Sequence, residues 1–266
     1  MNPFVAANAT RYARARPRYQ GQVLETAARV LGIDRPVRWA VDVGCGTGHS
    51  SMALAALAGR VVAIDSARKM LEVAEASDEI GYLAAAAERL PVRTGAVDLV
   101  TAGAVFHWLD GSVFLEEARR VLRPEGALVC YSDFFTGRIM EAPGVQSWIH
   151  DSYVPRHPGP PRRPHLTGEL ASTHGFEVVG SPELETAFVM TVEEFADYLL
   201  TQSNALASVQ SGLATEEELR CTILQSVKPL FPPSKVGTAL FRARALCCRR
   251  LASREGRQDE CDRVPS

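Results

Sequence analysis

The residues best suited to chemistry form a glycine-rich stretch, Val41-Asp-Val-Gly-Cys-Gly-Thr-Gly48, which follows an apolar run and precedes a helix-like segment. Glycines at 44, 46 and 48 permit a tight turn from strand to helix, and they let a ligand approach the backbone because no side chain blocks it. Loops of this kind serve nucleotide binders of several chemistries. The stretch therefore indicates a nucleotide-like ligand without identifying it.

Three neighbouring residues narrow the class of ligand. Asp42 precedes the first glycine, where a carboxylate would repel a diphosphate and attract a cationic amine. Asp65 ends the next apolar run, and its two oxygens suit the hydroxyls of a ribose. His49 stands where a dinucleotide motif requires Gly or Ala, which disfavours a nicotinamide oxidoreductase. A ligand with a ribose, an amine and no phosphate fits S-adenosylmethionine (SAM).

Apolar runs alternate with helix-like stretches around this loop. The strand-like runs cover residues 39–43, 61–65, 80–86, 96–103 and 127–135. Strands that are apolar throughout and alternate with helices predict a parallel sheet with helices on both faces. Residues 1–35 are expected to be helical, with an apolar stripe from Val23 to Leu31 that ends before Pro36.

The pattern changes after Phe135. Residues 136–164 hold six prolines and two large aromatic residues, and we expect this segment to form a lid on the ligand side of the sheet. An ordinary surface insertion is the alternative. Further helices are predicted at 166–174, 193–200 and 216–227, and further strands at 176–179, 184–190 and 236–248.

Composition limits the classes of function. The 29 basic and 31 acidic residues give a formal net charge of −2, which argues against a broad nucleic-acid surface. Six cysteines without regular spacing indicate reduced thiols, and no apolar run is long enough to span a membrane. No leader-like segment opens the sequence. We therefore expect a cytoplasmic protein with no metal site and no nucleic-acid or membrane partner.

The sequence resembles class I SAM-dependent methyltransferases, in the small-molecule branch around methyltransferase type 11 and the trans-aconitate methyltransferases. The stretches that carry the resemblance are VDVGCGTG (41–48), VVAIDSARKML (61–71), AAERLPVRTGAVDLVTAGAVFHWLD (86–110) and LEEARRVLRPEGALV (115–129). Two flanking stretches, YARARPRYQ (12–20) and TVEEFADYLLTQSNA (191–205), also fit.

The resemblance implies an α/β, Rossmann-like fold with a seven-stranded, mostly parallel sheet, an N-terminal helical segment and a lid insertion. It also implies that SAM is the cofactor, with its methionine part on the glycine loop, its ribose on Asp65 and its adenine near residue 87. Asp42 would hold the loop and lie near the amino group. The implied cofactor-binding residues are Tyr12, Arg16, Asp42, Gly44, Cys45, Gly46, Gly48, Asp65, Ser66, Met70, Ala87, Glu88, Ala102 and Gly103. For Glu88 a capping role, and for Met70 a place in the core, remain alternatives.

The acceptor side is less well defined. His107 follows the fourth strand and is the candidate general base, although an orienting or packing role in its loop fits as well. Expected walls of the acceptor pocket are Trp108, Phe135, Trp148, Tyr153, Gln202 and Ser203. The aromatic residues favour an apolar acceptor, unless they only anchor the lid. The arginines of the lid leave room for an acceptor with a carboxylate or a phosphate group instead.

Five parts follow from this interpretation. We expect an N-terminal helical segment that caps the core at 1–35, a SAM-binding core at 36–135, a lid at 136–175, C-terminal strands and helices that complete the sheet and the acceptor pocket at 176–253, and a flexible tail at 254–266. The predicted activity is methyl transfer from SAM to a small organic acceptor, such as a secondary metabolite, by a monomer or homodimer. The alternatives are a non-catalytic binding or regulatory protein of the same fold, and a methyltransferase of RNA or protein.

Overall fold

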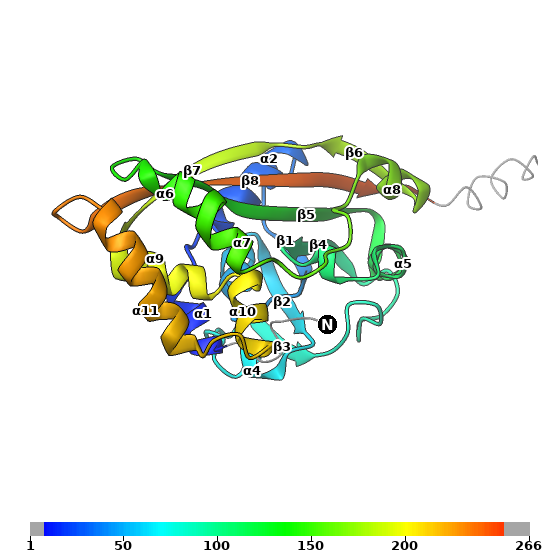
Figure 1. The fold of residues 1–266 in the computed structure, drawn as a ribbon. Helices are drawn as coiled ribbons and strands as arrows, with labels where there is room; N and C mark the ends of the chain where they lie inside the picture. The colour runs from blue at the N-terminus through cyan, green and yellow to red at the C-terminus, as the bar shows by residue number, and fades with distance from the viewer. Residues whose placement is uncertain (1–7, 253–266) are drawn as a thin grey trace, which may run out of the picture.

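The computed structural model describes residues 8–252, so the tail predicted at 254–266 lies outside the described residues. Its centre is an eight-stranded sheet in the order β3-β2-β1-β4-β5-β8-β6, with β7 also paired to β8 (Figure 1). The strands are β1 Val37–Val43, β2 Ala58–Asp65, β3 Ile80–Ala84, β4 Val97–Gly103, β5 Leu122–Ile139, β6 Phe176–Gly180, β7 Glu183–Thr191 and β8 Val236–Arg250.

The strands from β3 to β5 are parallel, and β8 runs antiparallel to β5, β6 and β7. The predicted Rossmann-like, mostly parallel α/β class is confirmed, but the expected number of seven strands is wrong. Two short strands pair with successive parts of the long β8, because β6 pairs with its end near Arg250 and β7 with the stretch from Arg244 to Val236.

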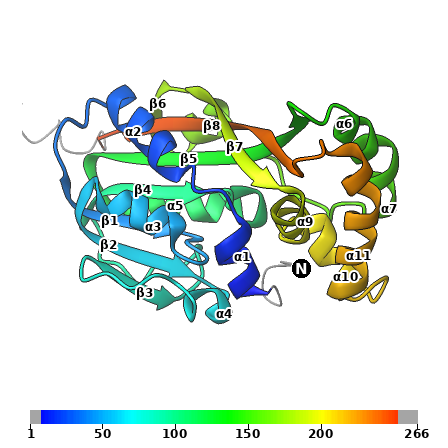
Figure 2. The same cartoon turned by 90° about the vertical axis from the view of Figure 1, so that its left-hand side faces the viewer.

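Helices cover both faces of the sheet. On one face, α2 (Gln20–Val30) and α3 (His49–Ala55) bury Leu24 and Leu54 against the strands, and Figure 2 shows both helices in front of the sheet. On the other face, α5 (Gly111–Val121) and α8 (Gly168–Thr173) bury Phe114 and Ala171. The short α4 (Arg68–Leu71) follows β2. This two-sided burial explains why the parallel strands are apolar throughout.

The N-terminal segment is two helices rather than the continuous helical stretch that was predicted. Helix α1 covers Ala9–Ala15 and ends at Arg16, whose backbone is extended (φ −78°, ψ 127°). Pro17 follows, and a proline disfavours the helical conformation in the residue before it. The chain therefore turns between α1 and α2. As a result α1 lies against α9 (Val192–Leu200), while α2 packs on one face of the sheet.

Strand β5 is longer than predicted. It pairs with β4 as far as Tyr131 and continues to Ile139 with β8 as its partner. The lid therefore begins after Ile139 and not at 136. It contains α6 (Gly144–Trp148), a π-helical turn (Ile149–Tyr153) and α7 (Val154–Arg156), followed by an irregular strap at residues 157–167.

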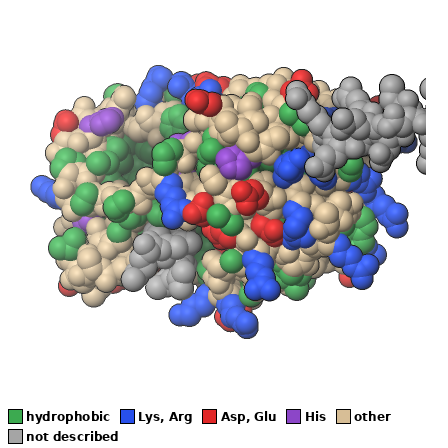
Figure 3. Space-filling view, turned by 90° about the vertical axis from the view of Figure 1, so that its right-hand side faces the viewer, with side chains coloured by type: hydrophobic (Ala, Val, Ile, Leu, Met, Phe, Trp, Pro, Cys, Tyr) green, Lys and Arg blue, Asp and Glu red, His purple; other side chains and the backbone are tan. Residues whose placement is uncertain are grey.

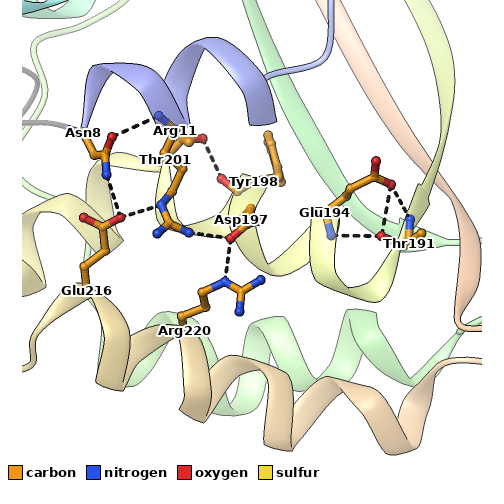
Figure 4. Close-up of polar contacts among 9 residues, drawn as sticks. All are labelled: Asn8, Arg11, Thr191, Glu194, Asp197, Tyr198, Thr201, Glu216 and Arg220. Atoms are coloured by element: carbon orange, nitrogen blue, oxygen red, sulfur yellow. Dashed lines mark hydrogen bonds and ion pairs between the residues drawn. The ribbon is translucent and has the colours of Figure 1, made fainter.

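A helical cap, made of α6, α7 and the helices α9 (Val192–Leu200), α10 (Ser203–Gln210) and α11 (Glu216–Val227), lies at the end of the sheet to which β5 extends (Figure 2). Its core is aromatic and aliphatic, with Phe195, Tyr198 and Phe241 almost completely buried. Capping boxes at Thr191 and Thr215 begin α9 and α11 (the first is drawn in Figure 4). Within residues 8–252, no helix is both long and apolar enough to cross a membrane.

Ion pairs bind α1 to this cap. The guanidinium of Arg11 lies 2.5 Å from Asp197 of α9 and 2.5 Å from Glu216 of α11, and Arg220 approaches the same Asp197 oxygen at 2.7 Å (Figure 4). Asn8 caps α1 through the backbone N–H of Arg11 and also donates to Glu216 at 3.3 Å. The N-terminal helix is thereby fixed to elements almost two hundred residues later in the chain.

Candidate active site

The glycine loop has the backbone that its composition predicts. Gly44, Gly46 and Gly48 have φ values of +68°, +54° and +85°, a region in which residues with side chains are strained. A Cβ on Gly44 would also lie 2.4 Å from a methyl group of Val105, and one on Gly48 would lie 2.5 Å from the hydroxyl of Tyr82. Both steric and conformational limits therefore require glycine in this turn.

Asp42 is buried next to the glycine loop and is hydrogen-bonded to the side chains around it. Its side chain is fully buried, and its two oxygens accept hydrogen bonds from the hydroxyls of Ser50 and Ser51 at 2.6 Å and Thr101 at 2.9 Å. Burial raises the pKa of this carboxyl, while the three hydroxyls oppose that rise. The loop-holding role predicted for Asp42 agrees with this geometry. Its place near the amino group of a cofactor stays a prediction.

Asp65 lies at the carboxyl end of β2, next to the loop. Its Oδ2 accepts from the backbone N–H of Gly46 at 2.9 Å and its Oδ1 from that of Ala67 at 2.7 Å. Burial raises its pKa, and these N–H donors lower it. Each carboxylate oxygen has a second lone pair, so Asp65 can still accept hydrogen bonds from a diol.

A narrow cavity of about 50 Å³ lies beside the loop, lined by Tyr12, Arg16, Tyr19, residues 44–47, Ser50, Gly103 and Tyr131 among others. Pockets that hold small molecules measure roughly 300–1,000 Å³. The N-terminal residues narrow this cavity because they lie directly over the loop. The segment that carries Tyr12 and Arg16 therefore covers the glycine loop in this structure.

Arg16 is the principal cation of this cavity. Its guanidinium lies 4.9 Å from the ring centre of Tyr12 and 5.5 Å from that of Tyr198, and its Nη2 donates to the carbonyl of Thr201 at 2.9 Å. Its Nε is buried without a hydrogen-bond partner. Burial, the largest effect, lowers the pKa of Arg16, but the surrounding phenols and Asp133 outweigh it and raise the pKa overall. The side chain stays charged.

The other predicted cofactor residues lie in different parts of the structure, and only some of them line the cavity. Gly103 and Cys45 line the cavity. Met70 is buried against Ala9, Ala67 and Tyr12, so it links the core to the N-terminal helix. Ser66 is exposed, while Ala87 and Ala102 are buried in the core of the sheet. Glu88 accepts a hydrogen bond from the backbone N–H of Asp110 at 2.9 Å and thus supports the start of α5. The N–H of Leu90, two residues after Glu88, donates to Glu117 and not to Glu88.

A second, larger cavity of about 610 Å³ adjoins the first, and both are lined by Ala104 and Tyr131. Its walls come from the loop after β4, from β5 and β8 and from the strap, at residues 104–107, 130–134, 162, 165–168, 181 and 244–246. It lies where β5 extends beyond β4. The position is suitable for an acceptor next to the cofactor.

His107 lines this second cavity and is itself buried. Its ring lies 5.3 Å from that of His165 and 4.9 Å from that of Trp108. Burial, together with the positive charge of Arg162 and His165, lowers the pKa of His107 to about 4. The imidazole is therefore neutral near pH 7 and able to accept a proton.

Three of the aromatic residues predicted to contact the acceptor belong to the core of the helical cap. Phe135 packs on Phe195 with ring centres 5.4 Å apart, and Trp148 stacks on Tyr153 at 5.2 Å. None of the three lines the larger cavity. This packing agrees with the alternative in which the rings anchor the lid, because apolar rings gain from burial against one another.

The remaining predicted acceptor residues support the wall from outside. Trp108 is half-buried, and the guanidinium of Arg162 lies over its ring, 5.6 Å from the ring centre. Ser203 is buried and accepts a hydrogen bond from Arg162 at 2.5 Å, while Gln202 is the N-cap residue of α10. Trp108 and Ser203 thus hold the strap through Arg162, and none of the three residues lines the larger cavity.

Sequence reasoning missed an aspartate in the site. Asp133 of β5 lines the larger cavity, accepts a hydrogen bond from the hydroxyl of Tyr19, and has a buried second oxygen without a partner. One signal was present: the polar pair at 132 and 133 interrupts an apolar strand at its carboxyl end. In the described part of the chain, no group of three or more His, Cys, Asp or Glu side chains is arranged to hold a metal ion.

Comparison with known proteins agrees with this geometry. Residues 41–130 match the family model of the methyltransferase domain. A candidate methyltransferase of Dictyostelium discoideum is 26% identical over 203 residues, which cover 74% of this chain and 76% of that protein. A malonyl-[acyl-carrier protein] O-methyltransferase of Hahella chejuensis is 38% identical over 114 residues, but the match spans only 41% of this chain and 40% of that enzyme.

Solved structures share the fold. A candidate type II methyltransferase of Anaeromyxobacter dehalogenans aligns with a TM-score of 0.69 at 23% identity, over 89% of this chain and 97% of that one. The [4+2]-cyclase SpnF aligns with a TM-score of 0.53 at 16% identity, over 88% of this chain and 81% of that one. Residues 41–130 thus match a methyltransferase domain, and in its sheet order and glycine loop the chain is similar to the class I SAM-dependent methyltransferases.

Proposed function

We propose that this protein transfers a methyl group from SAM to a small organic acceptor, such as a secondary metabolite. The observation that carries the proposal is the contact between the two cavities at Ala104 and Tyr131. One cavity lies on the glycine loop and the other is large enough for a drug-sized molecule. A cofactor held on the loop would present its reactive end to a molecule in the larger cavity.

The residues present fit this cofactor. The backbone of the glycine loop offers close approach, Asp65 would accept the ribose hydroxyls, and Arg16 would pair with the carboxylate. The unpartnered Nε of Arg16 is the observation that favours an anion there, because a buried donor without a partner costs roughly 1–3 kcal/mol. SAM supplies an electrophilic methyl group on a good leaving group.

The contribution of the protein is then mainly placement. In-line displacement gains from holding donor and acceptor in line and from excluding water, and it needs a base only when the acceptor must lose a proton. His107 is the base that we propose for such acceptors, since it is neutral and lines the larger cavity. A packing role for His107 is the alternative, and the two differ in the effect of its replacement on kcat.

The fold alone does not establish methyl transfer, since a [4+2]-cyclase shares it. A protein of this fold that binds SAM without turning it over remains the second candidate. A methyltransferase of RNA is disfavoured by the near balance of 29 basic and 31 acidic residues, and on the face shown in Figure 3 side chains of both signs are interspersed. We also propose a cytoplasmic location, which the reduced cysteines support.

The test begins with calorimetric titration of the full chain with SAM and S-adenosylhomocysteine. We expect both to bind, and we expect a panel of small acceptors to release S-adenosylhomocysteine in at least one case. Gly44→Ala should abolish binding of both, while Gly21→Ala, in open space on α2, should leave binding unchanged. Lack of cofactor binding by the wild-type chain would overturn the proposal, and binding without turnover over the whole panel would favour the non-catalytic candidate.

A further inference from the structure

Arg162 is a positive charge on the wall of the larger cavity that no acidic side chain of residues 8–252 compensates. The two other arginines nearby have carboxylate partners: Arg163 pairs with Asp110 at 3.5 Å and Arg244 with Glu183 at 3.6 Å. For Arg162 no carboxylate of the described chain lies within 4.0 Å. Its charge is therefore available to a ligand.

Neutral groups hold the Arg162 side chain in a defined position. Nη2 donates to Ser203 Oγ at 2.5 Å, and the guanidinium lies over the ring of Trp108. Ser203 is buried, so the anchor is rigid although the strap around residue 162 is exposed. Nη2 uses one of its two N–H donors on Ser203, and Nε and Nη1 have no bonded acceptor among residues 8–252, so the second Nη2 N–H and a neighbouring N–H form a planar pair of donors for a ligand.

Arg16 is a second cation that acts on Arg162. Burial, followed by the charge of Arg16, lowers the pKa of Arg162. Repulsion between these two cations in a partly dry site is unfavourable, and an anion beside Arg162 relieves it. Asp133 also lines the cavity, but it forms no ion pair with Arg162 and accepts a hydrogen bond from Tyr19 instead. Apolar residues form part of the remaining wall, namely Val105, Phe106, Phe134, Leu166 and Leu246, while Ser132, Asp133, Thr167, Ser181 and Arg244 form a polar part.

We propose that Arg162 binds an anionic group of the acceptor, a carboxylate or a phosphate, and that the apolar wall binds the remainder. A guanidinium with two free donors matches the paired oxygens of either group. This inference rests on the proposed function and names the substrate class of the same cavity: an organic acid or phosphate ester with an apolar body. Neutral and cationic acceptors would leave the charge of Arg162 uncompensated.

The test uses three probes that differ in their head group: 3-phenylpropionate, phenethyl phosphate and the neutral 3-phenylpropanamide. Each is titrated calorimetrically into the full chain saturated with S-adenosylhomocysteine. We expect at least one anion to bind about tenfold more tightly than the amide. Whichever anion binds better identifies the head group as carboxylate or phosphate.

Variants separate charge from packing. Arg162→Gln should remove the preference for the anion, and Arg162→Lys should keep part of it, because the charge remains while the paired donors are lost. Arg156→Gln is the matched control, since Arg156 is an exposed lid arginine that does not line the cavity. Affinity for S-adenosylhomocysteine should stay unchanged in all three variants.

The inference is overturned if the amide binds as tightly as both anions, if Arg162→Gln keeps the preference, or if neither anion saturates the protein below about 10 mM. Failure of the proposed function has a different signature, because S-adenosylhomocysteine itself would then not bind.

Discussion

The hydroxyl of Tyr19 donates a hydrogen bond to Asp133 Oδ1 at 2.5 Å, which joins the residue before α2 to the part of β5 that extends beyond β4. Tyr19 is buried, and burial followed by the charge of Asp133 raises its pKa well above the usual value, so the phenol remains a donor. The bond fixes the N-terminal segment at the border of the two cavities.

Removing this bond should destabilise the protein. We expect Tyr19→Phe to lower the free energy of unfolding by about 1.5–3 kcal/mol, the range for a hydrogen bond to a charged group. Urea denaturation measures the change, and a double-mutant cycle with Asp133→Asn isolates the pair. Equal effects of Tyr19→Phe in the wild-type and Asp133→Asn backgrounds would show that the two side chains are not coupled.

Asp65 should contribute directly to cofactor affinity. Asp65→Ala is expected to weaken SAM binding by about 1–3 kcal/mol, because a charge-assisted hydrogen bond is left unmade. The carboxylate also accepts the N–H of Gly46, so Asp65→Asn, which keeps a carbonyl oxygen, is the milder control. Calorimetry that finds unchanged affinity in the alanine variant would rule out the ribose contact.

The ion pairs of Arg11 should stabilise the closed position of α1. We expect Arg11→Gln to weaken SAM binding by about 0.5–1 kcal/mol, the scale of partly exposed ion pairs, which raises the dissociation constant about two- to fivefold. The effect should shrink at high salt. Arg14→Gln is the control, since Arg14 is exposed on the same helix and has no carboxylate within ion-pair distance in residues 8–252. Equal effects of the two variants would show that α1 closes independently of these pairs.

His107 should make stability depend on pH. Its pKa in the folded chain, about 4, lies below the ordinary value of 6.5, so the unfolded chain takes up a proton first as the pH falls. The folded state is therefore stabilised above pH 6.5 and loses this contribution between about pH 6.5 and 4. His107→Gln should flatten that part of a stability profile measured by urea denaturation. A profile identical to wild type would contradict the assignment.

The same variant tests catalysis. If His107 accepts a proton from the acceptor, His107→Gln should lower kcat steeply while the affinity for SAM stays constant. A near-normal kcat would assign His107 to packing against His165 and Trp108 instead.

Elements with local signals could be predicted from the sequence. Helix 216–227 begins and ends where its apolar spacing and the Thr215 capping box place it, and the glycine loop has the positive φ values that its composition implies. The break between α1 and α2 also has a local signal, Pro17, which the prediction of a helical segment over 1–35 did not include. The end of β5 was missed because residues 136–139 continue the strand only through pairing with β8.

The contacts of the site depended on tertiary structure that no short stretch encodes. Aromatic composition left open whether Phe135, Trp148 and Tyr153 contact a ligand or anchor the lid, and only the fold shows that they pack in the core of the helical cap. Likewise, Arg162 is one of several arginines in a proline-rich segment, and only the fold shows that Ser203, 41 residues later, holds it at the cavity.

The methyltransferase-domain match ends within β5, at residue 130, next to the last residue of β5 that pairs with β4. Most of the wall of the larger cavity comes from later in the chain, from the rest of β5, the strap and β8 among others. The glycine loop and most of the acceptor wall therefore belong to separate stretches of sequence. Exchange of the wall stretches should alter the choice of acceptor without loss of cofactor binding.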